Sequence, residues 1–151
     1  MIRKANSKRF QEILRVASGY RHLILSESFP VLFEYQGNKY RFWLSGGFAY
    51  DQASIPRILW PVIAPRELGY LPPAAHDYLI ERHGRVSIEK WSSYFGKWTD
   101  VEAPPFTREQ ADKLFCALMR SEGIPRWKRR LAYRAVRSYG AIKKFLTGKE
   151  W

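Results

Sequence analysis

Strand-like segments occupy residues 22–44, and in 39–44 apolar and polar residues alternate with a period of two, which is the pattern of a half-buried strand. Three segments there, 22–26, 30–35 and 39–44, are rich in β-branched and aromatic residues, and we expect each to be a strand. The third segment has two distinct faces: Tyr40, Phe42 and Leu44 on one, and Lys39, Arg41 and Trp43 on the other. Residues 36–38, Gln-Gly-Asn, suit a short hairpin loop with Gly or Asn at a positive φ. The pattern therefore predicts a small antiparallel sheet near the N-terminus.

Apolar residues at helical spacing predict helices on either side of this sheet. Residues 7–17 place Phe10, Ile13, Leu14 and Ala17 at that spacing, with Ser7 as a cap. Further helices are expected at four places: a short one after Pro56, one over 73–83, one from the capping box at Thr107 to about Gly123, and one from Pro125 onward. In the last helix we expect an apolar stripe formed by Trp127, Leu131, Ala135, Tyr139 and Ile142.

Residues 85–106 are aromatic without a clean period, so a hairpin and a covering loop both remain open there. The chain has no internal repeat, and we take residues 1–151 as a single domain. The order of elements is helix, sheet and then helices. This order predicts an α+β fold in which a small antiparallel sheet near the N-terminus is packed with four to five helices.

The composition is that of a folded domain. Of the 151 residues, 46% are apolar, and the six Trp, nine Tyr and nine Phe exclude a disordered chain. No apolar run reaches the roughly 18 residues of a membrane span, and the basic N-terminus lacks the apolar stretch of a secretory signal. Cys116 is the single cysteine, so no internal disulfide forms. We therefore expect a cytoplasmic protein.

The formal net charge of +12 is concentrated at the two ends of the chain. Residues 1–22 carry six Lys or Arg and one Glu, and residues 120–151 carry ten Lys or Arg and two Glu, whereas the middle is close to neutral. Such an excess attracts an anionic partner such as nucleic acid or an acidic protein, although basic helices also simply keep a small domain soluble. Phosphate contacts would come from the last helix, through Arg126, Lys128, Arg129, Arg130, Arg134 and Arg137.

Four polar residues lie within apolar stretches and are the candidates for chemistry: Asp51, His76, Asp77 and Asp112. A His-Asp pair such as His76-Asp77 can hold a metal. An acid early in a helix, however, is also stabilised simply by the helix dipole. Asp112 needs a partner if it is buried at the edge of its apolar stripe, and Arg108 and His76 are the two choices. Asp51 and Ser54 also suit an ordinary turn and helix cap. The GxSxG, P-loop, GxGxxG and paired CxxC motifs are absent.

Three spaced motifs occur together in the chain: Asp51-x-Ala53-Ser54-Ile55-Pro56-Arg57, Ala75-His76-Asp77-Tyr78-Leu79 and Arg108-x-x-Ala111-Asp112-x-x-Phe115. In this combination, over about residues 45–140, the chain resembles a phage- and prophage-encoded family of unknown function. Two positions depart from the family pattern, because Gln52 replaces its usual Gly and Tyr50 its usual small hydroxyl residue. The resemblance implies a phage or prophage origin and a place in the host cytoplasm or the virion. It implies no particular activity.

The resemblance also makes Asp51, His76, Asp77 and Asp112 the polar residues of the family pattern. Three carboxylates and one imidazole would suit one divalent ion, Mg²⁺, Mn²⁺ or Fe²⁺. With such an ion the protein would be a metal-dependent hydrolase of a phosphoester or cell-wall bond, and Ser54 or Arg57 would orient the substrate. In the other interpretation the same residues form a buried hydrogen-bonded network, in which His76 bridges Asp51 and Asp112.

Two functions therefore remain open. One is the metal-dependent hydrolase. The other is a noncatalytic phage accessory or virion protein that binds nucleic acid or a host protein through its basic terminal helices. The sequence does not decide whether the protein is an enzyme, nor its oligomeric state.

Overall fold

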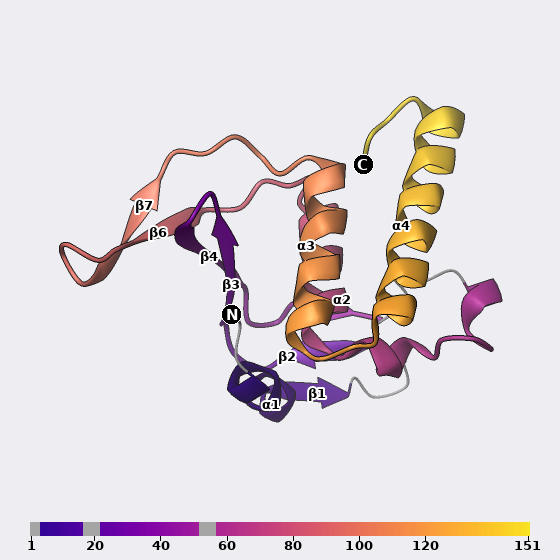
Figure 1. The fold of residues 1–151 in the computed structure, drawn as a ribbon, viewed down its shortest axis with the longest axis horizontal. Coiled ribbons are helices and arrows are strands. Elements are labelled where there is room, and N and C mark those ends of the chain that lie inside the picture. Colours follow the sequence, from indigo (N-terminus) through magenta and orange to yellow (C-terminus); the bar gives the residue numbers. More distant parts are fainter. Residues whose placement is uncertain (1–3, 17–21, 52–56) are drawn as a thin grey trace.

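The computed structural model describes residues 4–16, 22–51 and 57–151 (Figure 1). Its helices are α1 (Lys4–Glu12), the 3-10 helices η1 (Arg57–Leu59) and η2 (Pro65–Leu68), α2 (Leu71–Glu81), α3 (Arg108–Ser121) and α4 (Arg126–Thr147). Its strands are β1 (Leu14–Val16), β2 (Leu23–Leu25), β3 (Phe29–Tyr35), β4 (Asn38–Leu44), β5 (Ala49–Tyr50), β6 (Ile88–Ser92) and β7 (Lys97–Val101). The predicted α+β class is confirmed.

The strands form two antiparallel sheets, so the expectation of one small sheet packed with four to five helices is wrong. One sheet has the order β1-β2-β5 and the other the order β3-β4-β6-β7, and four α-helices accompany them in the described residues. The second sheet exists because β3 and β4 pair with each other and then with β6, whereas β2 pairs with β1 and β5. The link between β3 and β4 is a two-residue turn in which Gln36 and Gly37 both have positive φ.

The first helix is shorter than its apolar spacing predicts. Helix α1 ends at Glu12, and the chain then enters β1. The Ile13 amide donates to the Phe10 carbonyl at 3.3 Å, and the Ile13 carbonyl accepts from the Ser26 amide at 2.8 Å. Pairing with β2 therefore overrides the helical spacing of Leu14, whose side chain still packs against the core from a strand. Ala17, the last predicted helical position, lies outside the described residues.

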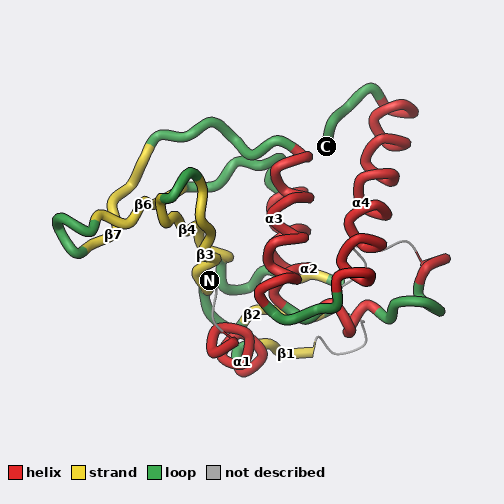
Figure 2. Tube along the Cα trace, viewed as in Figure 1, coloured by secondary structure: helices red, strands yellow, loops and turns green. Residues whose placement is uncertain are grey.

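Residues 85–106 contain a hairpin, which settles the alternative left open by the sequence. Strands β6 and β7 project from the rest of the molecule (Figures 1 and 2). Across the hairpin, the ring centroids of Trp91 and Trp98 lie 5.4 Å apart. The Arg41 guanidinium lies 4.5 Å from the Trp98 ring and donates to Glu89 at 2.6 Å. These contacts hold the hairpin on the sheet.

Helix α3 has the start that the sequence indicates, whereas α2 spans Leu71–Glu81 and so lies two residues earlier than the expected 73–83. Thr107 and Gln110 form the expected capping box at the start of α3. Gly84, with a φ of 73°, follows α2, and its amide donates to the Leu79 carbonyl at 2.8 Å. The Gly84 carbonyl accepts from the Phe106 amide at 2.9 Å, so this glycine fixes the entry to α3 beside the end of α2.

Helix α4 buries a face that overlaps only in part with the one expected. Three members of the predicted stripe, Trp127, Tyr139 and Ile142, are more than half exposed. Ala135 is buried as expected and Leu131 is half-buried, but the other buried positions, Ala132, Val136 and Gly140, lie outside the predicted stripe. Helices α3 and α4 stand side by side (Figure 2), and small residues allow two helix backbones to approach closely. Small residues therefore make up much of the contact face.

The apolar core has two parts, and α3 contributes to both. Ala111, Leu114 and Leu118 pack with the strands and with α1 and α2. Phe115 and Met119 pack instead with α4 and with a second group that includes Ile63 and Leu68. Cys116 lies beside this second part. None of the described helices is long and apolar enough to cross a membrane.

Candidate functional site

Asp112 is a fully buried carboxylate on α3, and three cationic side chains surround it. Its Oδ1 accepts a hydrogen bond from Nε of Arg108 at 3.3 Å and lies 2.7 Å from Nε2 of His76. Its Oδ2 accepts from Nη1 of Arg137 at 3.1 Å. His76 belongs to α2, and Arg137 belongs to α4. This Asp112 cluster therefore joins three helices through one side chain.

The charges in the cluster determine its protonation. Burial lowers the pKa of His76, but the hydrogen bond to Asp112 and the nearby Asp77 outweigh burial and hold that pKa above 6.5. Burial raises the pKa of Asp112, but the hydrogen bond and charge of His76, together with Arg108 and Arg137, hold that pKa below its ordinary value. Both shifts favour an ionised carboxylate beside a protonated imidazole.

The other ring nitrogen of His76, Nδ1, points away from Asp112 and has different neighbours. Nδ1 is buried, has no hydrogen-bond partner and lies 3.8 Å from Oδ1 of Asp77. The His76 ring also packs on Phe115, with 5.0 Å between centroids. Asp77 is partly exposed, with 25% of its side-chain surface accessible. It therefore lies at the edge of the Asp112 cluster.

Two of the other predicted site residues, Asp51 and Arg57, lie at the surface. Asp51 directly follows β5 and is exposed. Ser54 lies outside the described residues. Arg57 begins η1, is exposed, and holds its guanidinium 5.5 Å from the ring centroid of Trp60. The structure thus brings together His76, Asp77 and Asp112 from the predicted set.

These residues do not fit a metal site built on Asp112. Both of its carboxylate oxygens already accept hydrogen bonds from guanidinium groups, and a divalent cation there would face two further positive charges. Over residues 4–16, 22–51 and 57–151, no group of three or more His, Cys, Asp and Glu side chains is arranged to hold a metal ion. The contacts of Asp112 agree instead with the other interpretation, the buried hydrogen-bonded network. Of that network, the contact between His76 and Asp112 is present.

The chain matches a known protein family. The model of a family described as a protein of unknown function, DUF1353, matches residues 29–136. The chain belongs to the DUF1353 family. Comparisons of this DUF1353 protein with curated proteins and with solved structures give no match. The phage or prophage origin stays a prediction.

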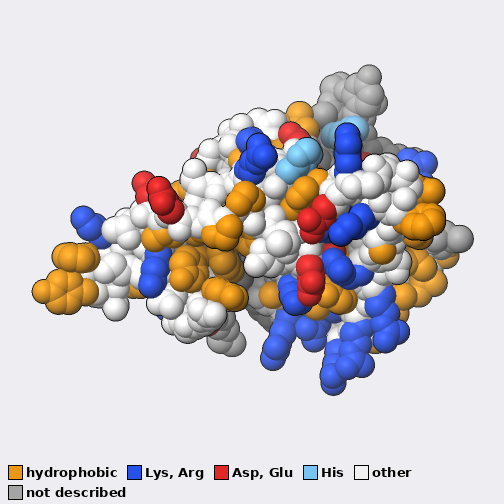
Figure 3. All heavy atoms as spheres, turned by 90° about the horizontal axis from the view of Figure 1, so that it is seen from above, with side chains coloured by type: hydrophobic (Ala, Val, Ile, Leu, Met, Phe, Trp, Pro, Cys, Tyr) orange, Lys and Arg blue, Asp and Glu red, His pale blue; other side chains and the backbone are white. Residues whose placement is uncertain are grey.

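The six predicted phosphate-binding residues of this DUF1353 protein fall into two groups. Three of them are half-buried: Lys128 donates to Glu67 at 2.8 Å, Arg137 donates to Asp112, and Nε of Arg129 is buried without a hydrogen-bond partner among the described residues. The other three, Arg126, Arg130 and Arg134, are exposed. Figure 3 shows a dense group of Lys and Arg side chains along one edge of the molecule.

The contact between Arg137 and Asp112 was missed by the sequence analysis, which weighed only Arg108 and His76 as partners. A signal for it exists in the sequence. Arg137 directly follows Val136, which is fully buried, and it lies one helical turn before Gly140. A base next to a buried helix face can reach inward, and a buried acid with two oxygens accepts more than two donors.

Proposed function

We propose that the protein binds nucleic acid, and that α4 makes the phosphate contacts. One observation carries the proposal: three arginines project into solvent from one line of a helix that has no acidic residue. Helix α4 contains eight Lys or Arg and no Asp or Glu. A polyanion approaching this helix meets no repulsive carboxylate on it.

The spacing of the exposed arginines suits a repeating anion. Arg126, Arg130 and Arg134 are four residues apart, so they lie on one line along the helix, about 6 Å apart along its axis. Each guanidinium offers several N–H donors in a planar fork, which matches the oxygens of a phosphate. A duplex presents phosphates at regular steps, and contacts of this kind position a protein without reading sequence.

The test compares two triple variants of equal charge change. In the first, Arg126, Arg130 and Arg134 are replaced by Gln. In the control, three exposed bases outside α4 are replaced by Gln: Lys8, Lys39 and Arg85. We expect the α4 variant to bind duplex DNA about tenfold more weakly or worse at low salt, and the control to lose much less. Equal losses in the two variants would show that only net charge matters and would refute the proposal.

The metal-dependent hydrolase stays a prediction, and the contacts of Asp112 support it less. Its test is separate from DNA binding. Metal analysis of the purified protein after incubation with Mg²⁺, Mn²⁺ or Fe²⁺ measures the bound ion directly. One bound ion per chain that disappears in Asp77→Ala, while the thermal unfolding of the variant is unchanged, would revive the hydrolase.

A further inference from the structure

A groove of about 920 Å³ lies between the inner face of the four-stranded sheet and α3. Four aromatic residues line it: Phe33, Tyr35, Tyr40 and Phe106. Its size is that of a pocket for a drug-sized ligand. The groove takes no part in the Asp112 cluster or in the row of arginines on α4.

The aromatic rings of the groove are already arranged as a platform. Phe33 and Tyr40 are stacked, with centroids 5.6 Å apart and 21° between ring planes. Phe106 meets Phe33 edge-on at 5.7 Å. Phe33, Tyr40 and Phe106 are half-buried, and Tyr35 is 58% exposed. Ring surface therefore remains for a flat ligand to stack on.

The charges around this platform favour an anion. Lys90 comes from β6, and Lys113 and Arg120 come from α3, against two carboxylates, Glu34 and Glu102. Lys113 pairs with Glu109, but both side chains are more than half exposed, and such surface pairs give way readily to a competing anion. Lys113 and Arg120 lie on α3, and α3 packs beside α4, so the helix that carries the row of arginines adjoins the helix that carries these two bases.

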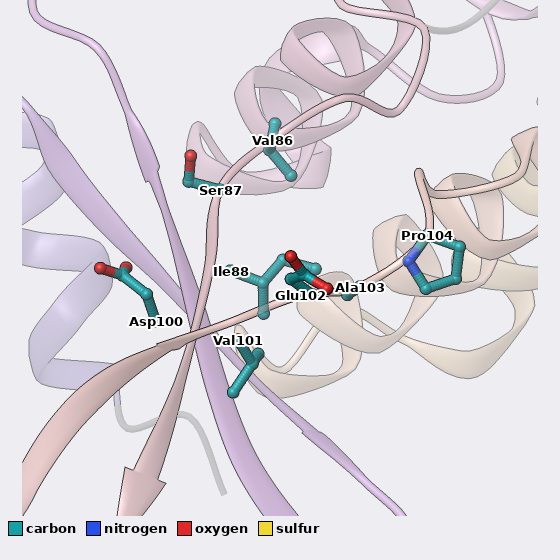
Figure 4. A pocket seen from close by; sticks show the side chains of 8 residues that line it. All are labelled: Val86, Ser87, Ile88, Asp100, Val101, Glu102, Ala103 and Pro104. Atoms are coloured by element: carbon teal, nitrogen blue, oxygen red, sulfur yellow. The ribbon is translucent and has the colours of Figure 1, made fainter.

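A second hollow, of about 800 Å³, lies beside the first and has the opposite character. The two share Ile88, Val101, Glu102, Ala103 and Pro104, but the second has no base in its lining and adds Asp100 (Figure 4). Figure 4 shows the carboxylates of Asp100 and Glu102 apart from each other, so they do not converge on one cation. A polyanion is therefore directed to the first groove rather than to the second.

We infer that the aromatic groove binds a short stretch of single-stranded nucleic acid. Unpaired bases stack on Tyr35 and Tyr40, and the backbone phosphates contact Lys113 and Arg120. This inference rests on the proposed function, because α4 would hold the neighbouring phosphates. Aromatic rings with a basic rim are the usual means of holding single strands without reading their sequence, since every base has a flat face.

The experiment measures fluorescence anisotropy with labelled oligo-dT of about ten nucleotides and with a duplex of the same length. Tyr35→Ala and Tyr40→Ala remove one ring each, and Tyr35→Phe and Tyr40→Phe keep the ring. Tyr94→Ala is the matched control, because Tyr94 is 88% exposed on the hairpin and does not line the groove. Thermal unfolding of each variant shows that the fold is kept. If Tyr40→Ala unfolds, Tyr35→Ala alone tests the inference, because Tyr35 is the more exposed of the two residues.

We expect the wild type to bind the single strand more tightly than the duplex. Each Tyr→Ala change in the groove should weaken single-strand binding about fivefold or more, whereas the Phe variants and Tyr94→Ala should keep it. Folded Tyr35→Ala that binds oligo-dT as the wild type does would overturn the inference, and so would poly-glutamate competing as well as oligo-dT. In those cases a duplex affinity that still depends on the α4 arginines would leave the proposed function standing. Absence of binding to either nucleic acid would remove both.

Discussion

Arg134 and Arg137 lie three residues apart on α4, yet they make different contacts. Arg137 donates to the buried Asp112 at 3.1 Å, whereas Arg134 faces solvent. The two side chains differ by about one sixth of a helical turn in direction. That difference separates a base that ties α4 to the buried acid on α3 from a base that is free to meet a phosphate. Counting charges along the helix cannot make this distinction, because it depends on where the buried acid lies.

The largest effect on stability should come from removing Asp112, the acid at the centre of the Asp112 cluster. Asp112→Ala leaves His76 and Arg108 buried without their common partner. We expect a loss of about 3–5 kcal/mol in the free energy of unfolding, measured with urea, because breaking a buried ion pair from one side leaves an uncompensated charge. A loss below about 1 kcal/mol would mean that water replaces the carboxylate and that the cluster does not hold the helices.

The Asp112 cluster should also make the free energy of unfolding depend on pH, with a decline on the acidic side and another on the alkaline side. The pKa of His76 is raised in the folded state, so its contribution is complete below about pH 6.5 and is lost as the pH rises through the higher folded value. The pKa of Asp112 is lowered, so its contribution is complete above about pH 3.8 and is lost as the pH falls through the lower folded value. Urea unfolding of the wild type should show highest stability between these limits.

His76→Gln is the control for the decline in stability on the alkaline side. With no imidazole to titrate, the loss of stability above about pH 6.5 should disappear in the variant. If the wild type and His76→Gln fall in parallel over that range, another group is responsible for the decline.

A smaller effect compares the two arginines directly. Arg137→Gln removes one charged hydrogen bond from Asp112, and because 39% of the Arg137 side chain is exposed, we expect a loss of only about 1 kcal/mol. Arg134→Gln should change the free energy of unfolding by less than about 0.5 kcal/mol. Parallel urea titrations measure both. Equal losses of stability in the two variants would contradict the different roles assigned to Arg137 and Arg134.

A small gain in stability, rather than a loss, should come from Gly140, the buried glycine of α4 beside Arg108. A Cβ placed there would lie 3.5 Å from the Arg108 guanidinium, which is ordinary contact. Gly140→Ala should therefore raise stability by up to about 1 kcal/mol through helix propensity. A clear loss in thermal unfolding would show that the α3–α4 contact is tighter than this spacing indicates.

Local signals in the sequence predicted much of the fold. The alternation of Tyr40, Phe42 and Leu44 marked β4, and the Thr107–Gln110 box marked the start of α3. Elements that depend on distant partners were missed. Leu14 joins a strand because β2 lies beside it, and the α4 contact face follows from its approach to α3. Neither partner is visible in a local window of sequence.

The candidate site was predicted only in part for the same reason. His76 and Arg108 were named as the candidate partners of Asp112 because an acid within an apolar stripe requires a partner, and both contact it. The acid's third partner, Arg137, comes from a helix whose rotation depends on small residues such as Ala132 and Gly140. The groove beside α3 could not be predicted, since it is formed by residues from β3, β4, β6 and the segment before α3 only after the sheet has assembled.

The salt dependence of duplex DNA affinity tests the central claim most directly. It is measured for the wild type and for the variant in which Arg126, Arg130 and Arg134 are replaced by Gln. Each lost phosphate contact reduces the slope of log affinity against log salt by about 0.9, so the account predicts a slope shallower by about 2–3 and an unfolding midpoint close to that of the wild type. An unchanged slope in a folded variant would contradict the account.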